Sequence, residues 1–262
     1  MNELLKWLLV GWGFAAGMML FVWLLSRRLN NAGIVDIAWS AGFAPVAVLY
    51  GLGAGGWGPR RWLIGGMVVL WSTRLGWYLY VRVIGHHPVE DRRYAALRAE
   101  WGREVDRKMF GFFQLQGALL VVLSVPFLLA SRNPSPGFSA WEWLGGGVWL
   151  VAWIGESLAD RQLQKYKANP ANRGGVCQVG LWRYSRHPNY FFEWLIWVAF
   201  FLFALGSSGG WITVYCPALM LYFLVRVTGI PMTEELAVKT KGDRYREYQR
   251  TTSGFVPWFP RP

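Results

Sequence analysis

The sequence predicts an all-α integral membrane protein with seven transmembrane helices. Of its 262 residues, 54% are apolar and only 16% are charged, whereas a soluble domain carries about 25% charged residues. Apolar stretches near the roughly 20 residues that cross a bilayer as a helix recur along the whole chain. We therefore expect a polytopic membrane fold.

The first four expected spans form the amino-terminal half of the chain. They cover residues 4–25, 33–52, 62–84 and 109–130. The first span lacks a short apolar region that ends in a small-residue cleavage site, so we expect it to be retained as a helix. The connection 85–108 carries alternating charges, which are typical of a solvated amphipathic helix.

The last three expected spans cover residues 144–160, 190–206 and 211–228. A long basic connection, 161–188, separates the first two of these spans. The tail, 229–262, is too polar to cross a membrane and rich in aromatic residues. We expect it to fold as a lid over the cytoplasmic mouth of the helices.

The basic residues indicate the orientation. The net charge of +12 is located between the apolar stretches, mostly in 26–32, 85–108, 161–188 and the tail. By the positive-inside rule, the amino terminus then faces outward and the carboxyl terminus faces the cytoplasm, with the pair Arg60–Arg61 as the exception. This distribution suits anionic lipid headgroups and argues against a nucleic-acid partner.

The start of the sixth span carries the most informative motif. Residues 180–193 read Gly-Leu-Trp-Arg-Tyr-Ser-Arg-His-Pro-Asn-Tyr-Phe-Phe-Glu. Pro188 suits the first position of a helix, whose free N–H groups favour an anion. Asn189 and Glu193 share a helix face and suit a carboxamide or another neutral polar group. The alternative is a helix cap with ordinary interfacial cations, which are Arg183, Arg186 and His187.

The connection before this motif adds further cations and glycines that suit a phosphate. It contains Asp160, Arg161, Lys165, Lys167, Asn169, Asn172, Arg173, Gly174 and Gly175. Glycines let a backbone approach a ligand closely, and cations can clamp a phosphate. The segment is neither a Walker loop nor a GxGxxG motif. Taken alone, it is better explained as a solvated basic loop.

Polar residues within the early spans suggest a second site. Asp36 lies in an apolar stretch, where we expect its carboxyl to stay protonated and to donate a hydrogen bond. Trp39 shares its helix face. Trp71, Arg74, Tyr78 and Arg82 recur at spacings of three and four in the third span. The alternative is a buried ion pair between Asp36 and Arg74.

The remaining polar residues give weaker indications of function. Cys177 and Cys216 have no metal-type spacing and are expected to be ordinary thiols. His86 and His87 lack the helical i, i+4 spacing of a histidine pair, so no metal site is predicted. In the tail, Glu234 and Glu235 either neutralise the basic loops or contact a ligand, in a segment that also holds Arg226, Arg244, Tyr245 and Tyr248.

These residues together resemble the steroid 5-alpha-reductase superfamily, and more narrowly its bacterial members. The resemblance rests on the motif 180–190, on Glu193, and on the tail pattern Glu234-Glu235, Tyr245, Tyr248 and Pro257, and it spans most of the chain. It implies a seven-helix enzyme of the bacterial inner membrane. It also implies that NADPH reduces the C4–C5 double bond of a 3-oxo-4-ene steroid, or of a similar lipophilic enone that enters from the membrane.

The resemblance also implies roles for particular residues. The chain would be one membrane domain, 1–262, with the substrate among the helices of 1–130 and the cofactor bound by 131–262. Asp36 matches a glutamate that hydrogen-bonds the substrate ketone. The positions that match NADPH contacts are Asp160, Lys167, Arg173, Tyr184, Asn189, Glu193 and Arg226.

The motif and the tail add Arg183, His187 and Tyr245 as candidate cofactor contacts. On the substrate side, Asp36 and Tyr78 are the candidate catalytic residues. The candidate substrate contacts are Asp36, Trp39, Trp71 and Arg74.

The chain departs from the family pattern at three positions. Trp71 replaces a ketone-facing tyrosine, and Ile230 and Glu234 replace a histidine and a tyrosine. The Arg-His-Pro-Asn-Tyr motif is also similar to that of membrane methyltransferases of the isoprenylcysteine carboxyl type, which bind S-adenosylmethionine. The seven expected spans and Asp36 favour the reductase, whereas Glu234, Glu235 and Ile230 favour the methyltransferase.

Overall fold

All regular elements among the described residues are helical. The structure is a computed structural model, and it describes residues 3–85 and 87–261. The chain divides into two compact units, Met1–Phe138 and Ser139–Pro262, which are described separately. This division falls a few residues after the position 130/131 where the two functional halves were expected to meet.

The residues described in the first unit form six α-helices, and most follow the expected spans. They are α1 (Glu3–Leu29), α2 (Ile34–Gly53), α3 (Gly58–Ile84), α4 (Arg92–Trp101), α5 (Val105–Leu123) and α6 (Val125–Arg132). The short helix α4 confirms the helix that alternating charges predicted between the third and fourth spans. Asp91 caps α4, because its side chain accepts a hydrogen bond from the backbone N–H of Arg93.

The fourth expected span, 109–130, is not one helix. It breaks at Ser124, between α5 and α6. Pro126 lies just after the break, and a proline ring has no N–H and clashes with the carbonyl four residues earlier. The Ser124 hydroxyl donates to the carbonyl of Val121 at 2.8 Å, which also competes with regular helix bonding.

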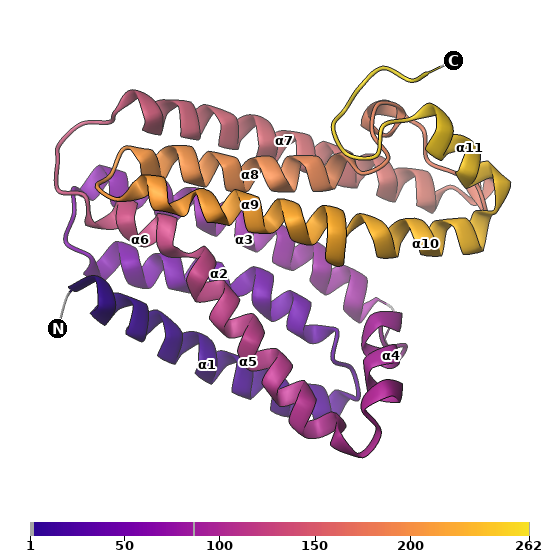
Figure 1. Cartoon of the computed structure of the whole chain (residues 1–262), viewed down its shortest axis with the longest axis horizontal. Coiled ribbons are helices and arrows are strands. Elements are labelled where there is room, and N and C mark those ends of the chain that lie inside the picture. Colours follow the sequence, from indigo (N-terminus) through magenta and orange to yellow (C-terminus); the bar gives the residue numbers. More distant parts are fainter. Residues whose placement is uncertain (1–2, 86, 262) are drawn as a thin grey trace. The chain divides into compact units, whose positions relative to one another are not determined.

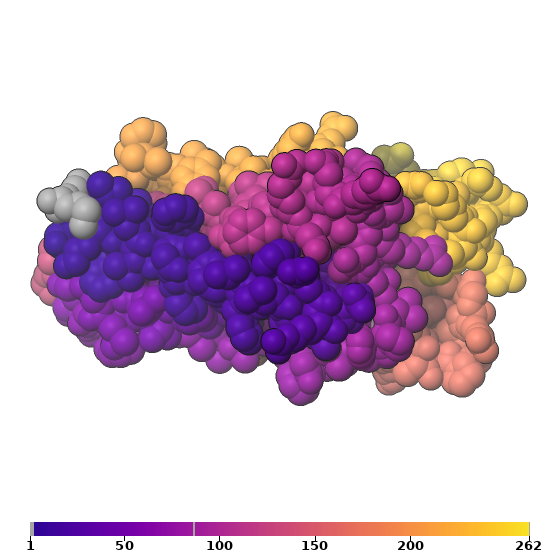
Figure 2. Space-filling view, turned by 90° about the horizontal axis from the view of Figure 1, so that it is seen from below, coloured from indigo at the N-terminus to yellow at the C-terminus, as the bar shows by residue number. Residues whose placement is uncertain are grey.

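A hydrophobic core joins α1, α2, α4 and α5. It includes Met19 of α1, Val35 of α2, Tyr94 of α4 and Phe113 of α5, all of them buried. Figure 2 shows α1 in indigo on the surface, beside the magenta side chains of α5. Its outer face carries exposed apolar side chains such as Trp12 and Phe21, as a lipid-facing helix requires.

The second unit is built on three long helical segments (Figure 1). Its elements are α7 (Ala140–Ala168), η2 (Pro170–Asn172), η3 (Gly180–Arg183), α8 (Pro188–Leu205), η4 (Gly210–Val214), α9 (Tyr215–Tyr222), the π-helical turn η5 (Phe223–Val227), α10 (Ile230–Lys241) and α11 (Asp243–Thr251). The last expected span, 211–228, is therefore a sequence of three helix types. A capping box between Ser139 and Glu142 begins α7.

Helices α7 and α8 pack closely along each other. Gly145 permits this approach, since a Cβ atom there would lie 2.6 Å from the backbone nitrogen of Phe203. The two helices therefore bring side chains of α7 and α8 into direct contact along their length. This contact positions the candidate site described below.

Five helical stretches of the described residues are long and apolar enough to cross a membrane. They are α1, α2, Arg92–Arg132, α8 and Gly210–Lys241. The helices α3 and α7 coincide with the expected third and fifth spans, but within the described residues they are not among these five. The membrane character is thus supported, while the seven-span count and the orientation stay predictions.

Candidate functional site

Helix α8 begins where the sequence predicted. Pro188 is its first residue and His187 is its N-cap. Asn189 and Glu193 follow at a spacing of four, so both project from the face of α8 that meets α7. The motif therefore places an amide and a carboxyl in the first turns of a helix that is apolar enough to cross a membrane.

The polar side chains of α7 and α8 form a buried group that we call the carboxylate–amide cluster. Its members are Glu156 and Asp160 of α7 and Asn189 and Glu193 of α8. The Asn189 Nδ2 atom donates to Asp160 Oδ1 at 3.4 Å. Trp197 Nε1 donates to Glu193 Oε1 at 3.0 Å. The three acids are almost inaccessible, with exposures of 3% for Glu156, 6% for Asp160 and 7% for Glu193.

The side-chain oxygen of Asn189 lacks a hydrogen-bond donor among the described residues. Asn189 Oδ1 is buried and receives no hydrogen bond from the residues that the structure describes. Leaving a buried polar atom unsatisfied costs about 1–3 kcal/mol, so nearly all such atoms in proteins have a partner or an ordered water. The carboxamide oxygen of Asn189 is therefore where an outside N–H or O–H donor would be accepted.

Sequence reasoning missed Glu156. It lies one helical turn before Asp160 on α7 and is buried more completely. A carboxyl in the middle of an apolar stretch was the available signal, because such a group is rare and faces a protein interior or a cavity. The spacing of four between Glu156 and Asp160 matches that between Asn189 and Glu193.

Arg186 and His187 make a different set of contacts, in what we call the tail knot. Arg186 Nε donates to Glu234 Oε1 at 2.6 Å, and its Nη1 donates to the carbonyl oxygen of Gln249 at 3.0 Å. His187 Nε2 lies 3.2 Å from the same Glu234 oxygen, and Gln249 donates to Glu234 Oε2 at 2.9 Å. Glu234 therefore neutralises the basic motif, as one of the two expectations for it stated.

The tail residues Tyr245 and Tyr248 are both buried beside this knot. The Tyr248 hydroxyl donates to the carbonyl oxygens of Trp182 and Ser185. Burial raises the pKa of the Tyr248 phenol far above its ordinary value, so the hydroxyl keeps its proton and its donor role. Burial, followed by the charge of Glu234, raises the pKa of Tyr245 in the same direction. The tail thus folds onto the segment before α8, as a lid would, but its membrane side stays a prediction.

The other predicted cofactor contacts lie on the surface of the second unit. Lys167 is at the end of α7, Arg173 follows η2, Arg183 is in η3, and Arg226 is in the π-helical turn. All four side chains are exposed, and Tyr184 is exposed next to Phe259, with ring centroids 5.9 Å apart. Asp160 is the one predicted contact of α7 that lies in the carboxylate–amide cluster. Roles for Lys167, Arg173, Arg183, Tyr184, His187, Arg226 and Tyr245 as cofactor ligands stay predictions.

The first unit contains a second polar group, the Asp36 cluster, made of Asp36, Arg82, Asp91, Arg93 and Tyr94. Tyr94 donates its hydroxyl to Asp36 Oδ1 at 2.6 Å, and Arg93 Nη2 donates to Asp36 Oδ2 at 2.7 Å. Arg82 Nη2 lies 3.5 Å from the same Oδ2. Asp36 is in the first turn of α2. It therefore pairs with Arg82 and Arg93 of the described residues, and not with Arg74.

Both oxygens of Asp36 are thus held by groups of the first unit, and its role as a donor to a substrate ketone stays a prediction. Sequence reasoning did not foresee these partners, because Arg93 and Tyr94 are 57 and 58 residues away in the chain.

The remaining predicted substrate contacts lie along α2 and α3. Trp39 and Trp71 both contact Phe43, with ring centroids 4.9 and 5.3 Å away. Trp71 is fully buried, and Trp39 Nε1 is buried without a hydrogen-bond partner among the described residues. Arg74 and Tyr78 are half-buried, one turn apart on α3. No cluster of three His, Cys, Asp or Glu side chains among the described residues could hold a metal ion, and His86 lies outside them.

Comparisons with known proteins give one family and one distant relative. A family profile described as "Protein of unknown function (DUF1295)" matches residues 22–252. The fission yeast protein "Uncharacterized protein C594.04c" of Schizosaccharomyces pombe is 26% identical over 261 residues, an alignment that covers 90% of this chain and 75% of that protein. No solved structure matches the chain significantly.

Proposed function

The chain belongs to the DUF1295 family, and from this premise we propose that it is a membrane-bound reductase of the steroid 5-alpha-reductase type. In this proposal it uses NADPH to reduce the C4–C5 double bond of a 3-oxo-4-ene steroid or of a similar lipophilic enone. The fold supports the proposal through its apolar helices, which suit a substrate that enters from the membrane.

The observation that carries the proposal is the buried, unpartnered oxygen of Asn189. A nicotinamide carries a carboxamide whose NH2 group is a donor for such an oxygen. Glu193, four residues later on the same helix, supplies a carboxylate on the same face. Polar groups that are buried at such a cost suit a ligand with complementary donors.

The phosphates of the cofactor need cations, and the second unit offers them next to the start of α8. Arg183 lies five residues before Pro188, and Lys167 and Arg173 belong to the connection that leads to it. The N–H groups in the first turn of α8 add positive partial charge. In the proposal these groups hold the phosphates, whereas Arg186 holds the tail.

The substrate side of the proposal follows from the contacts of Asp36. NADPH, when bound, would supply a hydride to the beta carbon of the enone, and a proton then adds to the alpha carbon. Negative charge develops on the ketone oxygen, and one donor aimed at such an oxygen is typically worth about 2.7–4 kcal/mol of the barrier. We propose the hydroxyl of Tyr78 as this donor and Trp39 and Trp71 as substrate contacts. Asp36 then acts as a positioning residue through Tyr94 and Arg93.

The test uses detergent-purified protein, NADPH and a 3-oxo-4-ene steroid. We expect loss of nicotinamide absorbance and a product reduced at C4–C5. The variant Asn189→Leu should bind NADPH about 5- to 140-fold more weakly, because it removes about 1–3 kcal/mol of hydrogen bonding to a buried ligand. Gln164→Leu is the matched control, since it removes an exposed amide of α7 and should leave binding unchanged.

The methyltransferase is the second candidate, because Ile230 and Glu234 stand where reductases have other residues. Glu234 is engaged in the tail knot, so its departure from the reductase pattern has a structural role. The same purified protein distinguishes the two functions when it is titrated with S-adenosylmethionine. Binding of this compound together with no binding of NADPH would replace the reductase with the methyltransferase.

A further inference from the structure

The end of the tail is a closed, well-anchored loop in the second unit. Residues 252–261 fold back on residues 182–186, immediately before α8. Four hydrogen bonds of 2.8 Å hold the loop: Arg186 N to Ser253 O, Ser185 Oγ to Phe255 O, Trp258 N to Tyr184 O, and Arg261 N to Thr251 O. The loop therefore presents its side chains from a fixed backbone, which lowers the entropy cost of binding a partner.

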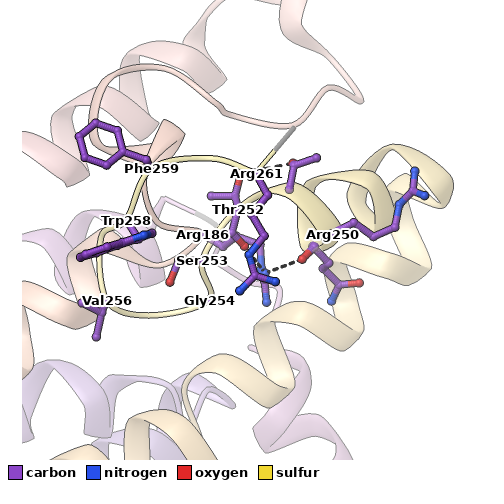
Figure 3. Close-up of a pocket in the computed structure, with 11 residues that line it drawn as sticks. Arg186, Arg250, Thr252, Ser253, Gly254, Val256, Trp258, Phe259 and Arg261 are labelled. Atoms are coloured by element: carbon purple, nitrogen blue, oxygen red, sulfur yellow. Dashed lines mark hydrogen bonds between the residues drawn. The ribbon is translucent and has the colours of Figure 1, made fainter.

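A cavity of about 430 Å³ opens between this loop and the end of α11 (Figure 3). Its lining contains three arginines: Arg186, which pairs with Glu234, Arg250, which pairs with Glu247, and Arg261. Gly254 leaves the Arg186 guanidinium uncovered, since a Cβ atom there would lie 3.1 Å from its Nη2 atom. Arg261 is the lining arginine without a carboxylate partner among the described residues, and it is the group that suits the cavity to an anion.

Three apolar side chains of the loop are exposed beside the cavity. Val256, Trp258 and Phe259 lie along one side of the loop, opposite Arg250 (Figure 3). Trp258 is 69% exposed and Phe259 is 75% exposed. Pro257 and Pro260 flank them and fix the local backbone φ angle. Large apolar side chains held outward in this way indicate a surface that contacts an apolar medium.

The position of the loop in the chain identifies that medium. Its partner segment, 182–186, directly precedes α8, an 18-residue helix that is apolar enough to cross a membrane. A membrane-spanning α8 would place the loop at the level where this helix leaves the hydrocarbon. Tryptophan is enriched at that level of membrane proteins, and arginine there attracts anionic headgroups.

We propose that this loop is a binding site for an anionic phospholipid. Trp258 and Phe259 enter the interfacial layer, and Arg261 contacts the phosphate of the headgroup. The Arg261 side chain is exposed and has no partner among the described residues, so it is available for this contact. The proposal does not depend on the identity of the cofactor or substrate.

The first experiment measures the depth of the loop in the membrane. The full chain is reconstituted in nanodiscs that contain phosphatidylglycerol, and a nitroxide spin label is attached to Phe259→Cys. The native Cys177 and Cys216 are buried, so labelling of the unmodified chain gives the background. We expect oxygen to relax the label more strongly than a polar nickel chelate does. The control label on Asp243→Cys, whose parent side chain is 95% exposed on α11, should show the reverse order. Equal polar accessibility at both sites would overturn the proposal.

The second experiment tests the headgroup by counting bound phosphatidylglycerol and phosphatidylcholine with native mass spectrometry. Arg261→Gln should lower the preference for phosphatidylglycerol about fivefold, the equivalent of about 1 kcal/mol for one arginine at an anionic surface. Arg246→Gln is the control, because its exposed guanidinium pairs with Asp243 outside the cavity. An unchanged preference in Arg261→Gln would refute the headgroup contact. Displacement of the lipid by inorganic phosphate or NADPH through Arg261 would assign the cavity to a soluble anion instead.

Discussion

The Asp36 cluster and the carboxylate–amide cluster place polar groups among apolar helices in opposite ways. In the Asp36 cluster, both carboxylate oxygens accept hydrogen bonds from groups of the first unit, Tyr94 and Arg93. In the carboxylate–amide cluster, Asn189 donates to Asp160, but its own oxygen accepts nothing from the described residues. The oxygens of Asp36 thus find their donors within the first unit, whereas the oxygen of Asn189 is a buried acceptor without a donor among the described residues.

This difference separates a structural role from a binding role. A buried charge with its partners in place becomes costly only when a partner is removed. A buried acceptor without a partner is already costly, and a ligand that donates to it removes that cost. Substitutions in the Asp36 cluster should therefore mainly lower stability. Substitution of the open acceptor in the carboxylate–amide cluster should mainly lower ligand binding.

The largest expected effect is on the stability of the first unit. Asp36→Ala removes the acceptor of the buried Tyr94 hydroxyl and one acceptor of Arg93, and should lower the free energy of unfolding by about 3 kcal/mol. Chemical unfolding in detergent, followed by circular dichroism, measures this loss.

Asp106→Ala is the control for that change. Asp106 forms an exposed ion pair with Arg27, which is worth at most about 1 kcal/mol. Equal losses of unfolding free energy in the two variants would mean that the contacts of Asp36 stabilise the unit no more than an exposed ion pair does.

A smaller effect is expected for Trp197→Phe in the second unit. The substitution keeps an aromatic ring but removes the indole donor of Glu193. We expect the free energy of unfolding to fall by about 1 kcal/mol, as for one hydrogen bond. A loss as large as that of Asp36→Ala would show that Glu193 belongs to a closed cluster, and the contrast between the two regions would weaken.

Acid should weaken the Asp36 cluster through Asp91. Burial alone would raise the pKa of Asp91, but the hydrogen bonds and charge of Arg93 outweigh it and lower this pKa. A lowered pKa in the folded state contributes stability above the unfolded value of about 3.9 and loses it as the pH falls further. The melting temperatures of the parent chain and of Asp91→Asn should therefore differ at neutral pH and converge below about pH 3.9. A constant difference would exclude this linkage.

The smallest effect on stability is expected for Asn189→Leu. The side chain loses one long hydrogen bond to Asp160 and also loses its unsatisfied oxygen, so the two changes offset each other. The free energy of unfolding without ligand should change by less than about 1 kcal/mol. Thermal unfolding with and without NADPH is the measurement. A large loss without ligand would mean that Asn189 is structural.

Much of the fold followed from the sequence, because apolar stretches of membrane length leave few alternatives to a helix. Pro188 predicted the first residue of α8, and the alternating charges of 85–108 predicted the helix α4. The break at Ser124 was overlooked, although Pro126 was its visible cause. The π-helical turn before α10 has no comparable signal in the sequence.

The candidate site was predicted less evenly. Asn189, Glu193 and Asp160 were identified, since the motif and the spacing of four are local features. The partners of Asp36 were not, because a contact across 57 residues depends on how α2 and α4 pack. The acceptors of Arg186 were not foreseen either, since they belong to the tail, 48 to 66 residues later.

The carboxylate of Glu234, on helix α10, contacts both the segment before α8 and helix α11. It therefore connects three separate stretches of the second unit. Because a single group serves all three, they should open as one cooperative unit and not one at a time. Amide hydrogens of α11 and of residues 182–186 would then exchange at a common rate, and that rate would report on the carboxylate without any change to the buried helices.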